Sequence, residues 1–464
     1  MPCSHSTPLS PPLGTMPPLR GHRGAPVRPK KARLDSSSGS DSPSHSMGLG
    51  APWTPLPLSI TSRLAPELYD HVLDEFHSSK STLSSCSLVC RAWLPICRQH
   101  LFFSVNLRPE LVNFLRNSPH ALATVTQHIR HVGLGGGWMR EQRHEFNDII
   151  LFAIALERVR KITLETFSWT YLPLASPATT ALLGGKGNVF QTLMVLELKF
   201  THFPSFSDLR IFASQFPNLR ELAFDNVTWD TKDGGPESGT SQPQPQPPSF
   251  LSRLEKLSIC ACSNEPLISW LDATDAMVAP IRSLYLPEIL PHEATLIGKL
   301  LASLPSSLEN LELGFLGHTY DDAPTIRSVV GEIDLSLHTR LRTIRIHQLS
   351  LYQFPSPPPT PPSSPPPPEI SPYVWLVPFL SRIESPELSA ISFDIWLGEE
   401  QQLDLIDWNA FVSLLNNPVF TKLRLVQFNV RGIEPVMDDE VTGWISRRLM
   451  DWDGAQEFLK VSFE

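Results

Sequence analysis

One short apolar pattern recurs along most of this chain and limits what the chain can fold into. It reads apolar-x-x-apolar-x-apolar, and its last two apolar positions alternate as in a half-buried strand. A helix-like stretch precedes most copies, for example at residues 146–157, 208–216, 293–304 and 408–415. A helix followed by a short strand, many times over, predicts a repeat architecture.

The pattern occurs eleven times, and each occurrence exposes an apolar face that only a neighbouring unit can cover. An ordinary α/β domain whose strands happen to share the pattern is the alternative, and this number of copies favours a stacked solenoid. The triplets are Ile129/Val132/Leu134, Val159/Ile162/Leu164, Leu193/Leu196/Leu198, Leu219/Leu222/Phe224, Leu254/Leu257/Ile259, Ile281/Leu284/Leu286, Leu308/Leu311/Leu313, Leu341/Ile344/Ile346, Leu388/Ile391/Phe393, Phe420/Leu423/Leu425 and Phe458/Val461/Phe463.

The repeats are irregular. Their first apolar positions are separated by intervals from 26 residues (Leu193 to Leu219) to 47 residues (Leu341 to Leu388), and most intervals exceed the roughly 20–29 residues of regular leucine-rich repeats. The Asn or Cys expected three places after the third apolar residue occurs only as Cys262. We therefore predict a degenerate leucine-rich-repeat-like α/β solenoid over residues 106–464.

Two proline-rich insertions interrupt the predicted repeats, at residues 231–249 and 355–372. The second contains 11 prolines in 18 positions and accounts for the longest interval between repeats. Proline runs favour extended polyproline II and cannot continue a sheet, so both insertions should loop out. Such a loop is either a ligand for SH3 or WW modules or a disordered insert.

Residues 1–55 have a different composition from the repeats. They hold 11 prolines, many Ser and Gly, and six Lys or Arg against two Asp or Glu. Such a segment cannot bury enough apolar surface to offset its ordering entropy, so we predict a disordered basic tail. Within it, the basic run from Arg28 to Arg33 is a candidate nuclear import signal, with a solvated charge run as the alternative.

A small helical module is predicted between the tail and the repeats, at residues 56–105. Leu68, Val72 and Phe76 recur at helical spacing over residues 64–77, and Pro66 suits a first helical turn. A second helix is predicted to start near Ser81 or Thr82 and to run through Leu83, Leu88 and Val89, and a third is predicted to begin near Pro95.

The residues of this module carry a specific resemblance. Leu64-Ala65-Pro66-Glu67-Leu68, then Leu83, then Ser87-Leu88-Val89-Cys90-Arg91-Ala92-Trp93-Leu94 resembles an F-box of the type abundant in mushroom-forming fungi. The family pattern opens with Leu-Pro-x-Glu-Leu, so Ala65 is a departure. The closing Val-Cys-basic-x-Trp stretch is the specific part.

The resemblance implies binding to a Skp-family adaptor and, through it, to a cullin–RING ubiquitin ligase. Carried over residue by residue, the candidate adaptor-binding positions are Leu64, Pro66, Leu68, Val72, Leu88, Val89, Cys90 and Trp93. Some should contact the adaptor and others should pack the module's own core. Trp93 is the anchor candidate, because buried Trp often dominates interface energetics.

The repeats would then bind an unknown protein substrate. Alternate strand positions face away from the core, and they should line a concave surface. We predict them at Lys161, Glu165, Glu197, Lys199, Glu221, Asp225, Asn310, Glu312, Arg345, His347, Lys422 and Arg424. Because Arg345, His347, Lys422 and Arg424 are cationic, we name them as substrate-binding candidates and hypothesise an acidic or phosphorylated partner segment.

Composition restricts the remaining classes of function. The net charge of the chain is −9 although the tail contributes about +4. The rest of the chain is therefore acidic and poorly suited to binding nucleic acid. No signal peptide, membrane span or disulfide pattern is present, so we expect an intracellular protein, cytoplasmic or nuclear, without nucleic-acid or membrane partners.

The residues provide no enzyme signature. The glycine-rich stretches at 133–137 and 184–187 lack phosphate-loop spacing, and Cys86, Cys90, Cys97 and His100 fit core packing better than a metal site. We expect no cofactor, no metal and no catalytic residue. The competing hypotheses are a protein-interaction scaffold without a ligase role and, less well supported, an enzyme on an α/β body.

Overall fold

The computed structural model describes residues 65–135, 143–169, 191–230, 249–262, 264–272, 280–304, 307–315, 330–351, 373–432 and 438–463. The chain divides after Leu64, and all the described residues belong to the second unit. Leu64, the predicted tail at 1–55 with its basic run, the insertion at 355–372 and all of the insertion at 231–249 except Ser249 lie outside the described residues.

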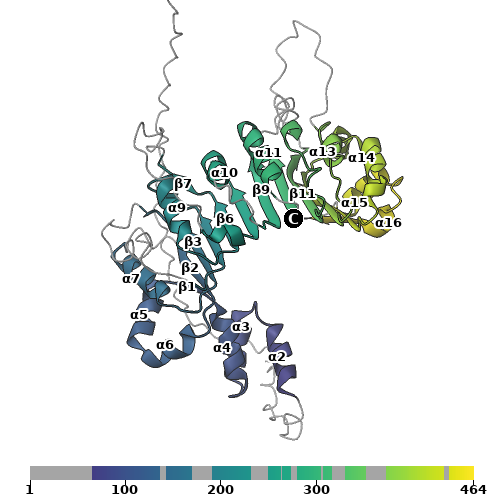
Figure 1. Cartoon of the computed structure of the whole chain (residues 1–464). Coiled ribbons are helices and arrows are strands. Elements are labelled where there is room, and N and C mark those ends of the chain that lie inside the picture. Colours follow the sequence, from purple (N-terminus) through teal and green to yellow (C-terminus); the bar gives the residue numbers. More distant parts are fainter. Residues whose placement is uncertain are drawn as a thin grey trace, which may run out of the picture. The chain divides into compact units, whose positions relative to one another are not determined.

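A parallel sheet of 12 strands runs through the described residues, and its strands follow one another in sequence order (Figure 1). The strands are β1 (Ser104–Leu107), β2 (His131–Gly135), β3 (Lys161–Glu165), β4 (Val195–Lys199), β6 (Glu221–Asp225), β8 (Lys256–Cys260), β9 (Ser283–Ile289), β10 (Asn310–Phe315), β11 (Thr343–Ser350), β12 (Ala390–Trp396), β13 (Leu425–Arg431) and β14 (Leu459–Phe463). A separate pair is formed by β5 (His202–Phe203) and β7 (Thr228–Trp229). The predicted mixed α/β repeat architecture is confirmed.

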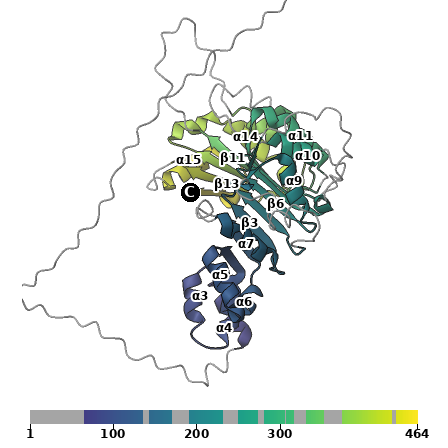
Figure 2. The ribbon, with the colours of Figure 1, turned by 90° about the vertical axis from the view of Figure 1, so that its left-hand side faces the viewer.

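The helices that follow β1 connect successive strands and lie along one face of the sheet, whereas three further helices precede β1 (Figures 1 and 2). They are α2 (Pro66–Asp74), α3 (Lys80–Cys86), α4 (Trp93–Phe103), α5 (Pro109–Asn117), α6 (Pro119–Thr126), α7 (Arg143–Ile154), α9 (Phe206–Ser214), α10 (Asn264–Asp272), α11 (Ala294–Ser303), α13 (Leu376–Leu380), α14 (Trp408–Leu415), α15 (Asp438–Arg448) and α16 (Ala455–Phe458). None of these helices is both long and apolar enough to cross a membrane.

Local sequence accounts for several helix starts. Pro66, Pro109 and Pro119 each stand in a first helical turn, where a missing N–H costs nothing. Ser205 and Asp407 accept a backbone N–H at the start of α9 and α14, which satisfies a donor that the helix itself cannot pair.

The apolar triplets set the strand register. Leu196 on β4 is level with Leu222 on β6, which is level with Leu257 on β8, and this ladder of middle triplet residues continues to Val426 on β13. The members of the ladder from Leu196 to Val426 are all at most 1% exposed. Each repeat therefore buries its apolar residues against the next, as the stacking argument requires.

Three details of the predicted elements are wrong. The second helix of the module ends at Cys86, so Leu88 and Val89 lie in the turn that follows it. In the repeat around β13 the buried triplet is Leu423/Val426/Phe428 rather than Phe420/Leu423/Leu425. In the last repeat Leu459 and Val461, rather than the predicted Val461 and Phe463, are level with Val426 and Phe428.

The turn after the strand repeats as regularly as the strand itself. Thr166, Phe200, Asn226 and Ala261 each stand one residue beyond β3, β4, β6 and β8 and have a positive φ near 50°. In the turn after β8, Cys262 directly follows Ala261. Its Sγ accepts the Val227 N–H at 3.2 Å and donates to the Cys260 carbonyl at 3.0 Å. The expected Cys position of the repeat is thus used, and Thr201 makes a similar bond to the Lys199 carbonyl.

The strands β9 and β10 shift register between Leu313 and Phe315, and Gly314 stands at this shift. A Cβ on Gly314 would lie 1.9 Å from the Pro287 carbonyl oxygen, whereas a Cβ on Gly443 in α15 would meet nothing within 4 Å. We expect Gly314→Ala to lower the unfolding free energy by about 1–3 kcal/mol through backbone overlap.

The matched control is Gly443→Ala, which should be neutral or stabilising by up to about 1 kcal/mol because alanine favours helix. Urea unfolding followed by circular dichroism measures both variants. Equal stability of the two would contradict the strand packing described for β9 and β10.

Candidate functional site

The three helices before β1 have a small core of their own. Leu73 on α2, Leu83 on α3 and Cys97 on α4 are fully buried. Both α2 and α3 pack on α4, and the Ser79 hydroxyl accepts the Thr82 N–H at the start of α3. These three side chains hold the helices together, and of the three only Leu83 belongs to the residues that carry the sequence resemblance.

Most of the residues that carry the resemblance lie outside this core. Leu68 and Val72, one turn apart on α2, are 50% and 51% exposed, and in the turn after α3 Leu88 and Val89 are 84% and 64% exposed. Cys90 is exposed as well. Burial of an apolar side chain away from water is favourable, so these residues form apolar surface that the other described residues do not cover.

Trp93 occupies an intermediate position at the start of α4. It is half-buried, and its ring lies 5.8 Å from that of Tyr69 on α2. Trp93 therefore joins the module's own packing while part of it remains accessible. Pro66 begins α2. The assignment of all these residues to adaptor binding remains a prediction.

No helix of the described residues lies over the other face of the sheet (Figures 1 and 2). Buried residues alternate with partly exposed ones on β3, β4 and β6 and over the first four residues of β10 and β11. Ten of the predicted outward positions occupy these alternate places: Lys161, Glu165, Glu197, Lys199, Glu221, Asp225, Asn310, Glu312, Arg345 and His347. We call this surface the uncovered face.

Lys422 and Arg424 do not belong to a strand, because β13 begins at Leu425. The overlapping apolar triplet in that repeat led to the error. Both residues lie at the start of the strand, where Lys422 Nζ is 3.1 Å from Glu387 Oε1. Their role in substrate binding stays a prediction.

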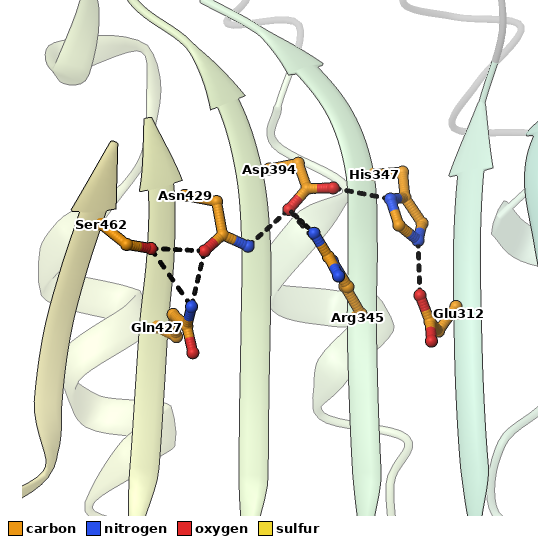
Figure 3. A network of polar contacts seen from close by, with 7 residues as sticks. All are labelled: Glu312, Arg345, His347, Asp394, Gln427, Asn429 and Ser462. Carbon is orange, nitrogen blue, oxygen red and sulfur yellow. Dashed lines mark hydrogen bonds and ion pairs between the residues drawn. The ribbon is translucent and has the colours of Figure 1, made fainter. Parts of the chain in front are cut away.

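A polar network crosses the uncovered face from β10 to β14 and is organised by one buried carboxylate (Figure 3). Asp394 is 4% exposed. Its Oδ1 accepts from Arg345 Nη2 at 2.8 Å, from Arg345 Nε at 3.0 Å and from Asn429 Nδ2 at 2.6 Å. Its Oδ2 lies 2.6 Å from His347 Nδ1.

The network extends in both directions from Asp394. His347 Nε2 lies 2.9 Å from Glu312 Oε2, and the side-chain oxygen Oδ1 of Asn429 accepts from Gln427 Nε2 and Ser462 Oγ at 2.6 Å each. A histidine that faces carboxylate oxygens with both ring nitrogens satisfies both contacts only as the imidazolium, which donates from each nitrogen.

Two opposite pKa shifts accompany this geometry. Burial alone would raise the pKa of Asp394, but the hydrogen bonds from His347, Arg345 and Asn429 outweigh it and hold the pKa well below its usual range. Burial alone would lower the pKa of His347, but its bonds to Asp394 and Glu312 raise it. Both shifts favour the ion-paired state of the network.

Arg345 and His347 are therefore already paired with acids of the same chain. Sequence reasoning identified both cations as candidates for binding an acidic partner, but it missed Asp394 and Asn429, which hold them. The available signal was an acid within the apolar strand Ile391-Ser392-Phe393-Asp394-Ile395. A buried charge needs partners, although sequence does not show which.

A hollow lies in the middle of the uncovered face, over β4, β6, β8 and β9. Glu197, Ala223, Ser258 and Tyr285 share one row across these strands. The two small side chains lie between two large ones, so the row dips at Ala223 and Ser258. At the β4 side, Glu197 is held by Lys161 Nζ at 2.7 Å and by the Thr163 hydroxyl at 3.1 Å.

The described residues do not group into a metal site. The His–Asp contact of the network resembles part of a catalytic triad, but its histidine has carboxylates at both nitrogens and so has no nitrogen left to accept a proton from a nucleophile. The arrangement is suited to positioning charged side chains on a surface.

Comparisons with known proteins give a weak signal. No family model matches this chain, and no curated protein matches it. Similar solved structures include a chain of the yeast Rad7–Elc1 complex (11% identity, covering 81% of this chain and 91% of that one, TM-score 0.36), the leucine-rich-repeat-containing protein LegL7 from Legionella pneumophila (12%, 74% and 97%, 0.36) and TLR13 in its complex with ssRNA13 (10%, 79% and 37%, 0.27). The large parallel sheet resembles leucine-rich-repeat solenoids, and scores this low carry no argument about function.

We expect Asp394→Asn to lower the unfolding free energy by about 2–3 kcal/mol, because it removes a charge that accepts four contacts in a buried place. The control Asp404→Asn removes a 70% exposed acid that pairs with Arg448, and should cost less than about 1 kcal/mol. Urea unfolding at neutral pH compares them, and equal losses would contradict the role given to Asp394.

The histidines predict a pH dependence of stability. The pKa of His347 is raised by folding, so its contribution is fully present below the unfolded pKa of about 6.5 and is lost as pH rises through the folded value. His347→Gln should therefore destabilise the protein more at pH 6 than at pH 9, as measured by thermal unfolding.

His338 supplies a control of opposite sign. It is 0% exposed, neither ring nitrogen has a hydrogen-bond partner in the described part of the chain, and burial lowers its pKa. The wild type should lose stability as pH falls below about 6.5 through charging of this group, and His338→Leu should reduce that loss. A pH-independent effect of His347→Gln would show that the network does not depend on the imidazolium.

Proposed function

We propose that this chain is a non-catalytic substrate receptor of a Skp–cullin–F-box type ubiquitin ligase. The helices α2 to α4 would bind a Skp-family adaptor, and through it a cullin complex, while the uncovered face binds a protein substrate inside the cell. Under this proposal the ligation chemistry belongs to other subunits, and this chain brings the substrate close to them.

One observation carries the proposal. Four of the candidate adaptor-binding residues, Leu68, Val72, Leu88 and Val89, are apolar and at least half exposed, whereas the module is held together by Leu73, Leu83 and Cys97. A small helical module exposes several apolar side chains together where a binding partner covers them. The assignment of that partner to the Skp family rests on the sequence resemblance.

The rest of the chain is compatible with this division of labour. The uncovered face presents rows of charged and polar side chains on a rigid sheet, which suits recognition of a protein segment. The described residues offer no grouped metal ligands. A protein-interaction scaffold without a ligase role shares all of these features except adaptor binding.

Co-purification with a purified Skp-family adaptor separates the two functions. We expect the full-length chain to form a stable complex, and the double variant Leu68→Asp/Leu88→Asp to weaken it by about tenfold or more, because two exposed apolar contacts are replaced by charges. The matched control, Ile211→Asp/Leu337→Asp, alters two residues that are 44% and 54% exposed on other elements, and should bind as the wild type does.

Circular dichroism must show that all three proteins are folded. A folded wild type that does not bind the adaptor would overturn the receptor proposal in favour of the scaffold. Binding by the Leu68/Leu88 variant at wild-type strength would overturn the assignment of the adaptor surface.

A further inference from the structure

A row of mostly charged residues borders the large sheet at the amino ends of its strands. The residue directly before each strand from β3 to β13 donates its backbone N–H to the carbonyl of the residue before the preceding strand, at 2.7 to 2.8 Å. Neighbouring members of the row are therefore about 4.8 Å apart, the spacing of the strands. The row reads Arg130, Arg160, Met194, Arg220, Glu255, Arg282, Glu309, Arg342, Ser389 and Arg424.

In the second half of the row, acids lie between the arginines. Arg282 and Arg342 both contact Glu309, at 3.5 and 3.6 Å. Arg342 also lies 3.9 Å from Glu387, which pairs with Lys422 at 3.1 Å. These three cations therefore already have partners in the chain.

The first half of the row has fewer acids. Arg220 pairs with Glu255 at 3.2 Å. Arg130 and Arg160 have no ion-pair partner within 4.0 Å among the described residues, and the same holds for Arg158 and Arg253 near them. We call the five arginines of this half the arginine rim: Arg130, Arg158, Arg160, Arg220 and Arg253.

The local field at the rim is positive. Burial, together with Arg158 and Arg160, lowers the pKa of Arg130. Burial, together with Arg130, Arg98 and Arg158, lowers the pKa of His128. No carboxylate of the described residues acts in the opposite direction at either group. The rim is thus a cationic surface on a chain whose net charge is −9.

A hollow lies at the rim, before the starts of β3, β4, β6 and β8. Arg160, Arg220 and Arg253 line it, and the one acid in its lining, Glu255, is the partner of Arg220. Arg160 and Arg253 therefore border the hollow without an acid, and Arg253 donates to the side-chain oxygen of Asn218. The other lining residues carry neither a charge nor an aromatic ring: Gln191, Thr192, Met194, Asn218, Ser252 and Pro280.

We propose that the arginine rim binds an acidic segment of the partner protein through the Asp and Glu carboxylates of that segment. A guanidinium can donate two parallel N–H groups to one carboxylate, which a lysine cannot do. This inference rests on the proposed function in taking the partner to be the substrate. It keeps the acidic partner expected from the sequence, but it moves the contact away from Arg345 and His347, which Asp394 and Glu312 already pair.

A nucleic acid fits the rim less well than an acidic protein segment does. The hollow has no aromatic side chain in its lining on which a base could stack. A long polyanion would also extend past the rim along an acidic body, whereas a short acidic segment places its charges at the rim alone.

Peptide binding tests the proposal. The probes are labelled 12-residue peptides of Ser, Thr and Gly that carry Asp, Asn, Lys or phosphoserine at three alternate central positions. Fluorescence anisotropy at low salt gives the dissociation constant of each peptide for the full-length chain. We expect the Asp peptide to bind about fivefold more tightly than the Asn peptide, the scale of a few exposed charge pairs. This advantage should shrink as salt is added.

Matched variants locate the site. Arg160 and Arg253 are both exposed, so Arg160→Gln/Arg253→Gln leaves the core intact and should remove most of the preference for Asp. Arg160→Glu/Arg253→Glu should reverse the preference in favour of the Lys peptide. The control Arg282→Gln/Arg342→Gln makes the same change of net charge in the same row, at arginines that Glu309 already pairs, and should keep the preference.

Three kinds of result would overturn the proposal. The first is equal binding of the Asp and Asn peptides, or an unchanged preference in the Arg160/Arg253 variants. The second is binding of the phosphoserine peptide without binding of the Asp peptide, which would assign the rim to phosphate groups. The third is tighter binding of a 12-nucleotide RNA than of the Asp peptide, lost in the same variants, which would assign the rim to nucleic acid.

Failure here is distinguishable from failure of the proposed function. Adaptor binding is measured on the same rim variants and should be unchanged, because none of the altered residues lies in α2 to α4. Binding of the Asp peptide without adaptor binding would leave the rim intact as a binding site and would remove the ligase role alone.

Discussion

The lateral pairing of parallel strands is the constraint on which the rest of this structure depends. Each repeat supplies one short strand whose apolar side chains cannot be covered within the repeat, so the strand is stable only between two others in register. The buried ladder from Leu196 to Val426 is the result. Because the register is fixed by these residues, the alternate polar positions fall into rows on the opposite face.

Because the polar positions form rows, polar side chains from different strands lie close enough to contact one another. Arg345 and His347 would be ordinary surface cations on a single strand, but the register places Asp394 and Glu312 on the flanking strands. Desolvation of Asp394 makes its hydrogen bonds strong and its loss costly. In the middle of the sheet the same register places the small residues Ala223 and Ser258 side by side, where the surface dips.

Sequence patterns predict what is local and periodic, and they fail where two choices satisfy the same pattern. Most triplets were located correctly because one placement fits. Around β13 both Phe420/Leu423/Leu425 and Leu423/Val426/Phe428 fit, and only pairing with Ile391 and Phe393 on β12 selects the second. The strand β1 was missed because its segment was assigned to the helical module, although Val105 and Leu107 pair with Val132 and Leu134.

The candidate sites show the same limit. Helical spacing identified the stripe of Leu68 and Val72, but spacing does not reveal that α2 turns Leu73 towards α4 and leaves the stripe in water. The partners of Arg345 and His347 come from strands about 35 to 49 residues away in sequence, beyond any local motif. The sequence therefore shows that Arg345 and His347 are cationic, but it does not show which acids of the chain pair with them.

Hydrogen–deuterium exchange of the full-length chain, with and without a purified Skp-family adaptor, tests the central claim most directly. The account predicts slower exchange on adaptor binding within residues 66–103, where the uncovered apolar side chains lie, and unchanged exchange in the strands β4 to β9 that border the hollow. Protection confined to the sheet, or no protection anywhere in a folded chain, would contradict the division of the molecule into an adaptor-binding module and a partner-binding sheet.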